Sequence, residues 1–475
     1  MPATWKRLSR ALLSALLVLA LASCKKEPEV KYVFYLIGDG MGINHVFGAQ
    51  EYNRATGTGP QVINFTRFPV HNFITTPSSS SLVTDSAAGG TALSSGIKTY
   101  NSAVGVDADT VAVTSLTDWA AAAGYGTGLC TNVGLNHATP ACFMAHTPKR
   151  KNYKEIALQY LTAPVDFAGA AGVIRRDKRT RKRLPDTAFL EKAREAGISV
   201  FRGPSFEGLA ETEGRVLCLS GKDEIELPYA IDRKEDDTQL CDFVRAGIDY
   251  LYSRFGRKGF FFMIEGGKID YAGHGDDMAA CIQEVNDFAY AIDLVLDFWK
   301  AHPDETLIVI TADHETGGLM LGSGDYKMDP ERLMNQKMSK LALTEQFRNT
   351  FYVEGEAQAA PSWQQVRDFF RKHLSLWDKV EVSAEAEAGL RAVYDRTVSH
   401  GWDLSDENLY SEYSALVVEA VDILTRSAGY LWSYESHSGS PVGLYVQGKC
   451  WERFATVQDN TEIAPLIAEL AGYQR

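Results

Sequence analysis

Basic residues are scarce in this chain relative to acidic ones. It contains 48 Lys and Arg against 61 Asp and Glu in 475 residues, which gives a formal net charge of −13. Binding to a phosphate backbone depends on clustered Lys and Arg, so this balance argues against a nucleic acid partner. One strongly basic stretch, residues 175–183, is typical of a solvated loop, with contact to an anionic lipid surface as the alternative.

Paired cysteines, internal repeats and low-complexity tracts are also missing. Six of the seven cysteines follow Cys24, and none of them has CxxC spacing. They could form disulfides or remain as buried free thiols, because sequence does not give connectivity. The 45% apolar content excludes disorder, and the length suits one large α/β domain with insertions.

The apolar run at the N-terminus, residues 11–22, is too short to remain as a bilayer-spanning helix. Three basic residues precede it, which is the pattern of an export signal. The run ends in LASC at residues 21–24, which resembles a bacterial lipobox, and an ordinary cleaved signal peptide is the alternative. We therefore expect a lipoprotein signal peptide at 1–23, a membrane anchor on Cys24 and a short tether at 24–30. The expected location is the periplasm or outer membrane of a Gram-negative bacterium.

Continuous apolar runs alternate with helical stretches along the chain. The runs lie at residues 32–37, 260–264, 306–310 and 441–446. This alternation is typical of a parallel sheet covered on both faces. The sequence therefore predicts an α/β three-layer sandwich with a large, mostly parallel central sheet. Such sheets bind ligands at the carboxyl ends of their strands.

Side chains that bind metals lie next to these runs. They are Asp39, Glu265, Asp270, His274, Asp313, His314 and His437. Each alone could be a helix cap or a surface histidine, but the set as a whole suits zinc, with a harder oxygen site nearby for magnesium. Two divalent ions about 4 Å apart can bind the attacking and the leaving oxygen of an in-line displacement.

Ser86 stands where a loop turns into an Ala-rich helix, in the segment VTDSAAGGTA at residues 83–92. The start of a helix offers unpaired backbone N–H groups and the positive end of the helix dipole, which together favour phosphate. A hydroxyl here could attack a phosphorus atom whose oxygens are already held. The alternative is that Asp85 or Ser86 only caps the helix, and the nearby metal ligands favour the catalytic interpretation.

In combination, these motifs resemble those of the alkaline phosphatase family, in the family's order along most of the mature chain. The segments that carry the resemblance are LIGDGMG, VTDSAAGGTALSSGIKTYNSAVGV, ATPACFMAHTPKR, EGGKIDYAGH, TADHETGG and SHSG. The resemblance implies a phosphate monoester hydrolase that releases inorganic phosphate through a phosphoserine intermediate. It also implies two zinc ions, one magnesium ion and a homodimer.

Carried over position by position, the resemblance implies a role for each matching residue. Ser86 matches the nucleophile, and Arg150 matches the arginine that clamps the phosphate. The ligands of one zinc ion would be Asp270, His274 and His437, and those of the other would be Asp39, Asp313 and His314. Asp39 would also reach the magnesium ion, together with Thr139 and Glu265.

Two positions depart from the best-known bacterial pattern. His137 stands where many bacterial members have aspartate, and Tyr271 replaces a basic residue. A neutral imidazole lacks the charge that would hold the waters of a magnesium ion. We therefore expect the third site, which His137 would face, to bind magnesium weakly and to admit zinc when zinc is in excess.

A long segment, residues 321–431, separates the last two motifs and is rich in Lys, Glu, Gln and Leu. Amphipathic stretches at 363–374 and 409–424 predict helices. We expect a catalytic domain formed by 31–320 and 432–475, with 321–431 as a mostly helical insertion. The insertion would cover the site entrance or contribute to a subunit contact.

Other functions fit these motifs less well. A sulfatase would carry Cys or Ser in a Cx(P/A)xR setting, and Ser86 is followed by AAGG. The spacing of Gly38, Gly40 and Gly42 is wrong for a dinucleotide-binding fingerprint. A phosphodiesterase or phosphomutase with the same metal core is the main alternative. A phosphate-binding lipoprotein without activity is a further one, although binding alone needs no activated nucleophile.

Overall fold

The computed structural model describes residues 29–175, 185–322, 326–352, 360–400, 403–407 and 410–473. The predicted signal peptide at 1–23, Cys24 and residues 176–183 of the basic stretch lie outside this part of the chain. Among the described residues, no helix is both long and apolar enough to cross a membrane. The six cysteines described are all free thiols, which decides between the two alternatives left open by the sequence.

Nine strands form the central sheet, in the order β2-β15-β8-β1-β7-β3-β4-β6-β5. They are β1 (Tyr32–Gly38), β2 (Val70–Ile74), β3 (Gly126–Thr131), β4 (Phe167–Ala170), β5 (Ser199–Arg202), β6 (Val216–Leu219), β7 (Phe260–Gly266), β8 (Thr306–Thr311) and β15 (Val442–Gly448). Strand β15 runs antiparallel to β8 and β2, and all other pairs are parallel. The predicted α/β fold with a mostly parallel sheet is confirmed.

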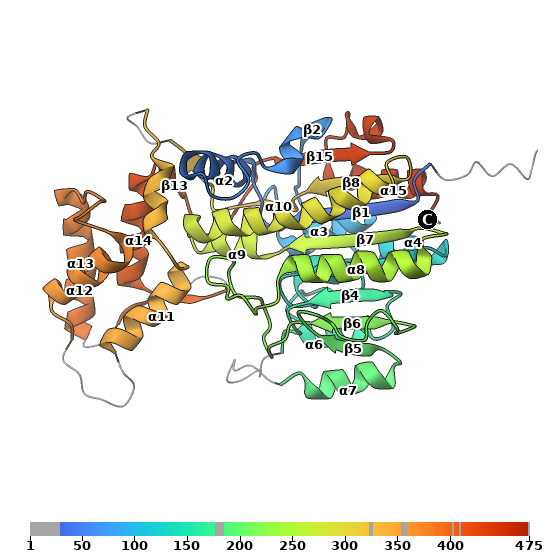
Figure 1. Ribbon diagram of the computed structural model, residues 1–475, viewed down its shortest axis with the longest axis horizontal. Helices are drawn as coiled ribbons and strands as arrows, with labels where there is room; N and C mark the ends of the chain where they lie inside the picture. The colour runs from blue at the N-terminus through green and yellow to red at the C-terminus, as the bar shows by residue number, and fades with distance from the viewer. Residues whose placement is uncertain are drawn as a thin grey trace, which may run out of the picture.

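Helices lie on both faces of this sheet. In Figure 1, α8 and α10 lie in front of it, and α3 and α4 lie behind it. The helices around the sheet are α2 (Ile43–Thr56), α3 (Ser86–Ser95), α4 (Leu116–Ala122), α5 (Ala138–Ala141), α6 (Tyr153–Tyr160), α7 (Thr187–Glu195), α8 (Leu240–Phe255), α9 (Lys268–His274), α10 (Met278–Ala301) and α15 (Ile463–Ala471). Helix α10 buries Ile282, Val285, Phe288 and Ile292, whose spacing places them on one face.

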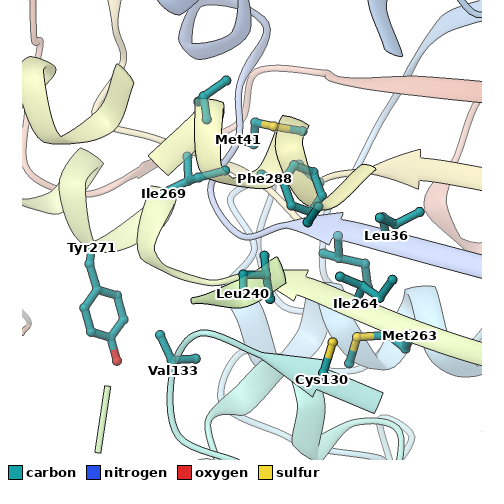
Figure 2. Close-up of a cluster of buried hydrophobic side chains, with 14 of the residues drawn as sticks. Leu36, Met41, Cys130, Val133, Leu240, Met263, Ile264, Ile269, Tyr271 and Phe288 are labelled. Carbon is teal, nitrogen blue, oxygen red and sulfur yellow. The ribbon is translucent and has the colours of Figure 1, made fainter. Parts of the chain in front are cut away.

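Strands β1 and β7 are buried along their whole length, which explains why each is a continuous apolar run. Ile37 pairs with Glu265 of β7 on one side and with Thr311 of β8 on the other. The three strands therefore end at the same level, and the residues that follow them share one edge of the sheet. Figure 2 shows Leu36 and Ile264 among the buried apolar side chains near this edge, whereas Tyr271 points away from them.

Four further helices, α11 (Lys340–Phe351), α12 (Trp363–Leu374), α13 (Ala384–His400) and α14 (Ala415–Ser427), gather beyond the carboxyl ends of β1 and β7, at the left of Figure 1. Helix α12 has the predicted bounds. Helix α14 begins later than the amphipathic pattern at 409–424 predicts. The reason is that β12 (Glu412–Ser414) pairs with β11 (Ser405–Glu407) in a short hairpin before the helix starts.

Candidate active site

Ser86 is the first residue of α3 and is fully buried. Asp85 takes the capping role, because its side chain accepts a hydrogen bond from the Ala88 backbone N–H at 3.0 Å. The Ser86 hydroxyl is thus not used as a helix cap. Its Oγ lies 3.1 Å from His314 Nε2 and 3.4 Å from Arg150 Nη1. The capping alternative therefore applies to Asp85 and not to Ser86.

Small residues let α3 approach the strand ends this closely. A Cβ atom on Gly89 would lie 2.9 Å from the Asp313 carbonyl oxygen and 3.1 Å from the Asp313 Cβ. Gly40 has a φ of +67°, and a Cβ there would lie 2.8 Å from Asp270 Oδ1. Both glycines are needed where two segments that carry site residues touch.

Two histidines face a common carboxylate on one side of the site. His274 Nε2 and His437 Nε2 are 3.1 Å apart, and they lie 3.5 Å and 3.7 Å from Asp270 Oδ1. The Nδ1 atoms of the two rings lie 2.7 Å and 2.9 Å from the carbonyl oxygens of Glu435 and Thr84. A carbonyl only accepts, so each Nδ1 carries the proton and each Nε2 presents a lone pair. This donor set fits a zinc ion.

A second set surrounds His314. Its Nε2 lies 3.3 Å from Asp39 Oδ1 and 3.5 Å from Asp313 Oδ2, and its ring stacks on that of His437 with centroids 3.6 Å apart. The ligand atoms of Asp39, Asp313 and His314 lie within 4.8 Å of one another, as do those of Asp270, His314 and His437. His314 therefore lies between the two groups of predicted zinc ligands.

The buried carboxylates of this site repel one another. Burial and the nearby Asp313 raise the pKa of Asp39 well above its usual range. Burial and Asp270 raise the pKa of Asp313 to about 7. Carboxylates that are dry and close together need a cation between them to remain ionised, so their crowding fits a metal centre.

A third set comprises Asp39, His137 and Glu265. Among the described residues, Asp39 Oδ1, His137 Nδ1 and Glu265 Oε1 are buried atoms with no hydrogen-bond partner. Thr139 Oγ1 lies 3.3 Å from Asp39 Oδ2 and adds a neutral oxygen. Unpaired buried oxygens are costly, so this set fits a hard cation such as magnesium with its waters.

Arg150 contacts the imidazole ring of His137. Its Nη2 lies 3.3 Å from His137 Nε2, and its Nη1 lies 3.1 Å from Asp85 Oδ2. A guanidinium only donates, so Nε2 is the acceptor in this contact. The Nδ1 atom lies 3.8 Å and 3.9 Å from oxygens of Asp39 and Glu265. It therefore faces the same space as the two carboxylates, where it can meet an ion or the waters of that ion.

The site also contains Tyr410, which sequence reasoning missed. Its hydroxyl donates to Asp270 Oδ2 at 2.9 Å, and its ring stacks on Tyr271 with centroids 3.7 Å apart. Tyr410 comes from the β11–β12 hairpin, 140 positions from Asp270. It does not follow a predicted strand and belongs to none of the sequence motifs, so the sequence does not indicate that it lies in the site.

An open cleft of about 1760 Å³ leads to the site. Its lining includes Arg150, Tyr271, His274, Tyr410 and His437. The volume is well above the roughly 300–1,000 Å³ of a typical small-molecule pocket, because the cleft is open to solvent.

Comparison with known proteins decides the family. A sequence model of the alkaline phosphatase family matches residues 30–166 and 212–473. The chain belongs to the alkaline phosphatase family. It is 31% identical over 453 residues to alkaline phosphatase 3 of Bacillus subtilis, covering 94% of this chain and 90% of that protein. Alkaline phosphatase 4 of the same species is 29% identical over 456 residues, covering 94% and 91%.

The fold agrees with this assignment. The crystal structure of a cold-active alkaline phosphatase from the psychrophile Shewanella sp. superposes with a TM-score of 0.72 at 28% identity, covering 93% of this chain and 99% of that one. The chain is therefore a phosphate monoester hydrolase with a metal-binding active site. The predicted family, fold and enzyme class are confirmed.

Proposed function

We propose that this alkaline phosphatase transfers the phosphoryl group of a monoester to Ser86 and then to water, releasing inorganic phosphate. The observation that carries this proposal is the position of the Ser86 hydroxyl. It lies between His314 and Arg150 at the start of a helix, with three groups of candidate metal ligands around it. The Ser86 hydroxyl would give up its proton to solvent and its oxygen would attack phosphorus in line with the ester oxygen. The P–O bond to the alcohol would break, and the alcohol would leave with a proton from solvent. A water molecule would later displace Ser86 and form inorganic phosphate.

Arg150 supports this step by its charge and its orientation. Asp85 holds one end of its guanidinium at 3.1 Å, while the group remains within 3.4 Å of Ser86 Oγ. A planar guanidinium in this position can donate two parallel hydrogen bonds to the equatorial oxygens of the phosphoryl group. It would neutralise charge that grows as the ester bond breaks.

The residues that would hold the metals are those brought together at the sheet edge. Asp270, His274 and His437 would bind one zinc ion, and Asp39, Asp313 and His314 would bind the other. Asp39, Thr139 and Glu265 would hold magnesium, with His137 facing its waters. When bound, such ions supply positive charge for the attacking and leaving oxygens. The chain itself orients the ligands through the carbonyls of Thr84 and Glu435.

Further proposals concern the rest of the chain. We infer export through residues 1–23, a lipid anchor on Cys24, a periplasmic or outer-membrane location and a homodimer. We also infer that 31–320 and 432–475 form the catalytic domain and 321–431 the insertion. The signal pattern in the sequence supports export and the anchor, and the position of α11–α14 beyond the sheet supports the division into domain and insertion. The homodimer is proposed from the resemblance to the family alone. The family assignment sets the binding-only alternative aside.

A hydrolysis panel tests the function. Purified, zinc-loaded protein would be given phosphate monoesters, phosphate diesters and sulfate esters at matched concentrations. We expect the monoesters to have the highest kcat/KM by a wide margin, because Arg150 and the helix start suit a dianionic phosphoryl group. A preference for diesters would favour the phosphodiesterase alternative, and phosphoryl transfer between two positions of one substrate would favour a phosphomutase.

A further inference from the structure

Tyr410 is a residue of the helical insertion that reaches the active site. Its hydroxyl donates to Asp270 Oδ2 at 2.9 Å. Its ring lies nearly parallel to that of Tyr271, with an interplanar angle of 14°, and meets the His274 ring edge-on with centroids 5.2 Å apart. A residue of the insertion therefore contacts two of the predicted ligands of one zinc ion.

The two oxygens of Asp270 have different partners. Oδ1 accepts a hydrogen bond from Thr316 Oγ1 at 2.5 Å and faces the Nε2 atoms of His274 and His437. Oδ2 accepts from Tyr410. A carboxylate held at both oxygens is not free to turn about its Cβ–Cγ bond. The Tyr410 hydroxyl thus fixes which oxygen of Asp270 faces the imidazoles.

The hairpin that carries Tyr410 is itself anchored on the insertion. Arg348 of α11 donates to Asp403 Oδ2 at 2.8 Å and to the Tyr413 carbonyl oxygen at 3.1 Å. Ser414 Oγ donates to the other oxygen of Asp403 at 2.7 Å. Asp403 is buried, so this network ties both ends of the hairpin to α11.

We propose that Tyr410 is a positioning residue that holds Asp270 ready to bind metal and thereby couples the packing of the insertion to the metal affinity of the active site. This proposal rests on the proposed function of Asp270 as a zinc ligand. Removal of a partner that orients a metal ligand typically weakens metal binding by 10- to 100-fold. The aromatic stack on Tyr271 adds a second restraint, because it fixes the ring from which the hydroxyl projects.

Zinc affinity of the full chain, measured by competition with a chromogenic chelator in the absence of substrate, tests the proposal. Tyr410→Phe keeps the ring and removes only the hydroxyl, so we expect zinc to bind about tenfold more weakly. Tyr394→Phe is the matched control, because that hydroxyl, also in the insertion, donates to the Pro361 carbonyl at 2.9 Å. We expect its zinc affinity to equal that of the wild type.

A second variant tests the coupling to the insertion. Arg348→Met loosens the hairpin without touching the site, and we expect it to weaken zinc binding by a smaller factor than Tyr410→Phe. In the double variant the two effects should not add, because both act through one contact. Full additivity would show that Arg348 acts on the metal by another route and would overturn the coupling.

The outcomes separate this proposal from the proposed function. An active wild type and an unchanged zinc affinity in Tyr410→Phe would overturn the positioning role and leave the function intact. A wild type that binds zinc but hydrolyses no monoester would overturn the function, while the affinity difference would still support the positioning role. A wild type that binds no zinc would overturn both.

Discussion

The edge of the sheet and the helical insertion place their functional side chains in different ways. At the edge, Asp39, Glu265 and Asp313 each lie at the end of a buried strand or within two residues of it, so the register of β1, β7 and β8 brings them together. In the insertion, Tyr410 lies on a short hairpin whose position depends on packing against α11. The comparison teaches that pairing between strands brings the candidate metal ligands together. Packing of the insertion, in our proposal, then sets the orientation of one of these ligands, Asp270.

The two regions share one continuous apolar core, to which each contributes its own set of side chains. Strands β1 and β7 contribute side chains such as Phe34 and Phe262, which are fully buried. The insertion packs around Phe347, whose ring stacks on Phe370 with centroids 5.7 Å apart and an interplanar angle of 2°. Loss of the Phe347 ring should therefore act first on the insertion, because the aromatic rings that contact it lie there.

Removing the metals should have the largest effect. Exhaustive chelation should abolish hydrolysis, because the ions that the ligand sets at the sheet edge would hold supply the positive charge that the reaction needs. Zinc should restore activity better than magnesium alone, since imidazole favours zinc. The measurement is turnover of a chromogenic monoester before chelation, after it and after each addition. Full activity in a preparation shown by elemental analysis to be metal-free would contradict the assignment of the edge residues.

The substitution Ser86→Ala should have the second largest effect on activity. We expect kcat to fall by roughly a thousandfold or more, because the nucleophile is lost while other catalytic groups remain. Zinc content and thermal stability should stay at wild-type values, because Asp85 caps the helix. An acid quench with labelled phosphate should trap phosphoserine in the wild type only. Near-normal turnover in the variant would mean that a water molecule attacks phosphorus directly.

Phe347→Ala should destabilise the insertion more than the sheet, because the aromatic neighbours of Phe347 lie in the insertion. Truncating a buried Phe costs about 3–5 kcal/mol, and we expect protease cleavage within α11–α14 to accelerate. Zinc affinity should fall no further than in Tyr410→Phe, because the insertion reaches the ligands chiefly through that residue. Phe262→Ala on β7 is the matched comparison and should reduce zinc affinity more strongly. Equal losses from the two substitutions would mean that the regions unfold as one unit.

His137→Asp should have the smallest effect of the four on turnover at saturating metal, and its effect on magnesium affinity should be favourable. A charged oxygen near Asp39 and Glu265 should tighten magnesium about 10- to 100-fold, because it holds the ion's waters. A magnesium titration of activity at fixed low zinc measures this change. If wild type and variant saturate at the same concentration, His137 does not face the third ion.

Much of the fold and the candidate site could be predicted from local sequence. Buried parallel strands are continuous apolar runs, and the residues next to them in the chain lie at one edge, so Asp39 and Asp313 could be placed without coordinates. Ser86 could be placed because its segment also specifies a helix start. The roles of these residues as nucleophile and ligands remain predictions.

Other features depend on contacts between distant segments. Tyr410 reaches Asp270 only because the hairpin packs on α11, and its neighbours in sequence give no sign of this. The amphipathic pattern at 409–424 predicted one helix, but pairing between β11 and β12 delays the start of α14. The contact between Arg150 and His137 Nε2 is another feature that the sequence did not predict, and the expectation that the third site admits zinc when zinc is in excess stays a prediction.

Two short strand pairs close the base of the insertion. Strand β9 (Glu315–Thr316) pairs with β14 (His437–Ser438), and β10 (Met320–Leu321) pairs with β13 (Tyr430–Leu431). The chain therefore departs from the catalytic body and returns to it at a single point, where His437 is brought beside His314. Because closing a longer loop adds only a small entropic cost, segments of very different length could be grafted between these strands while the histidines keep their places.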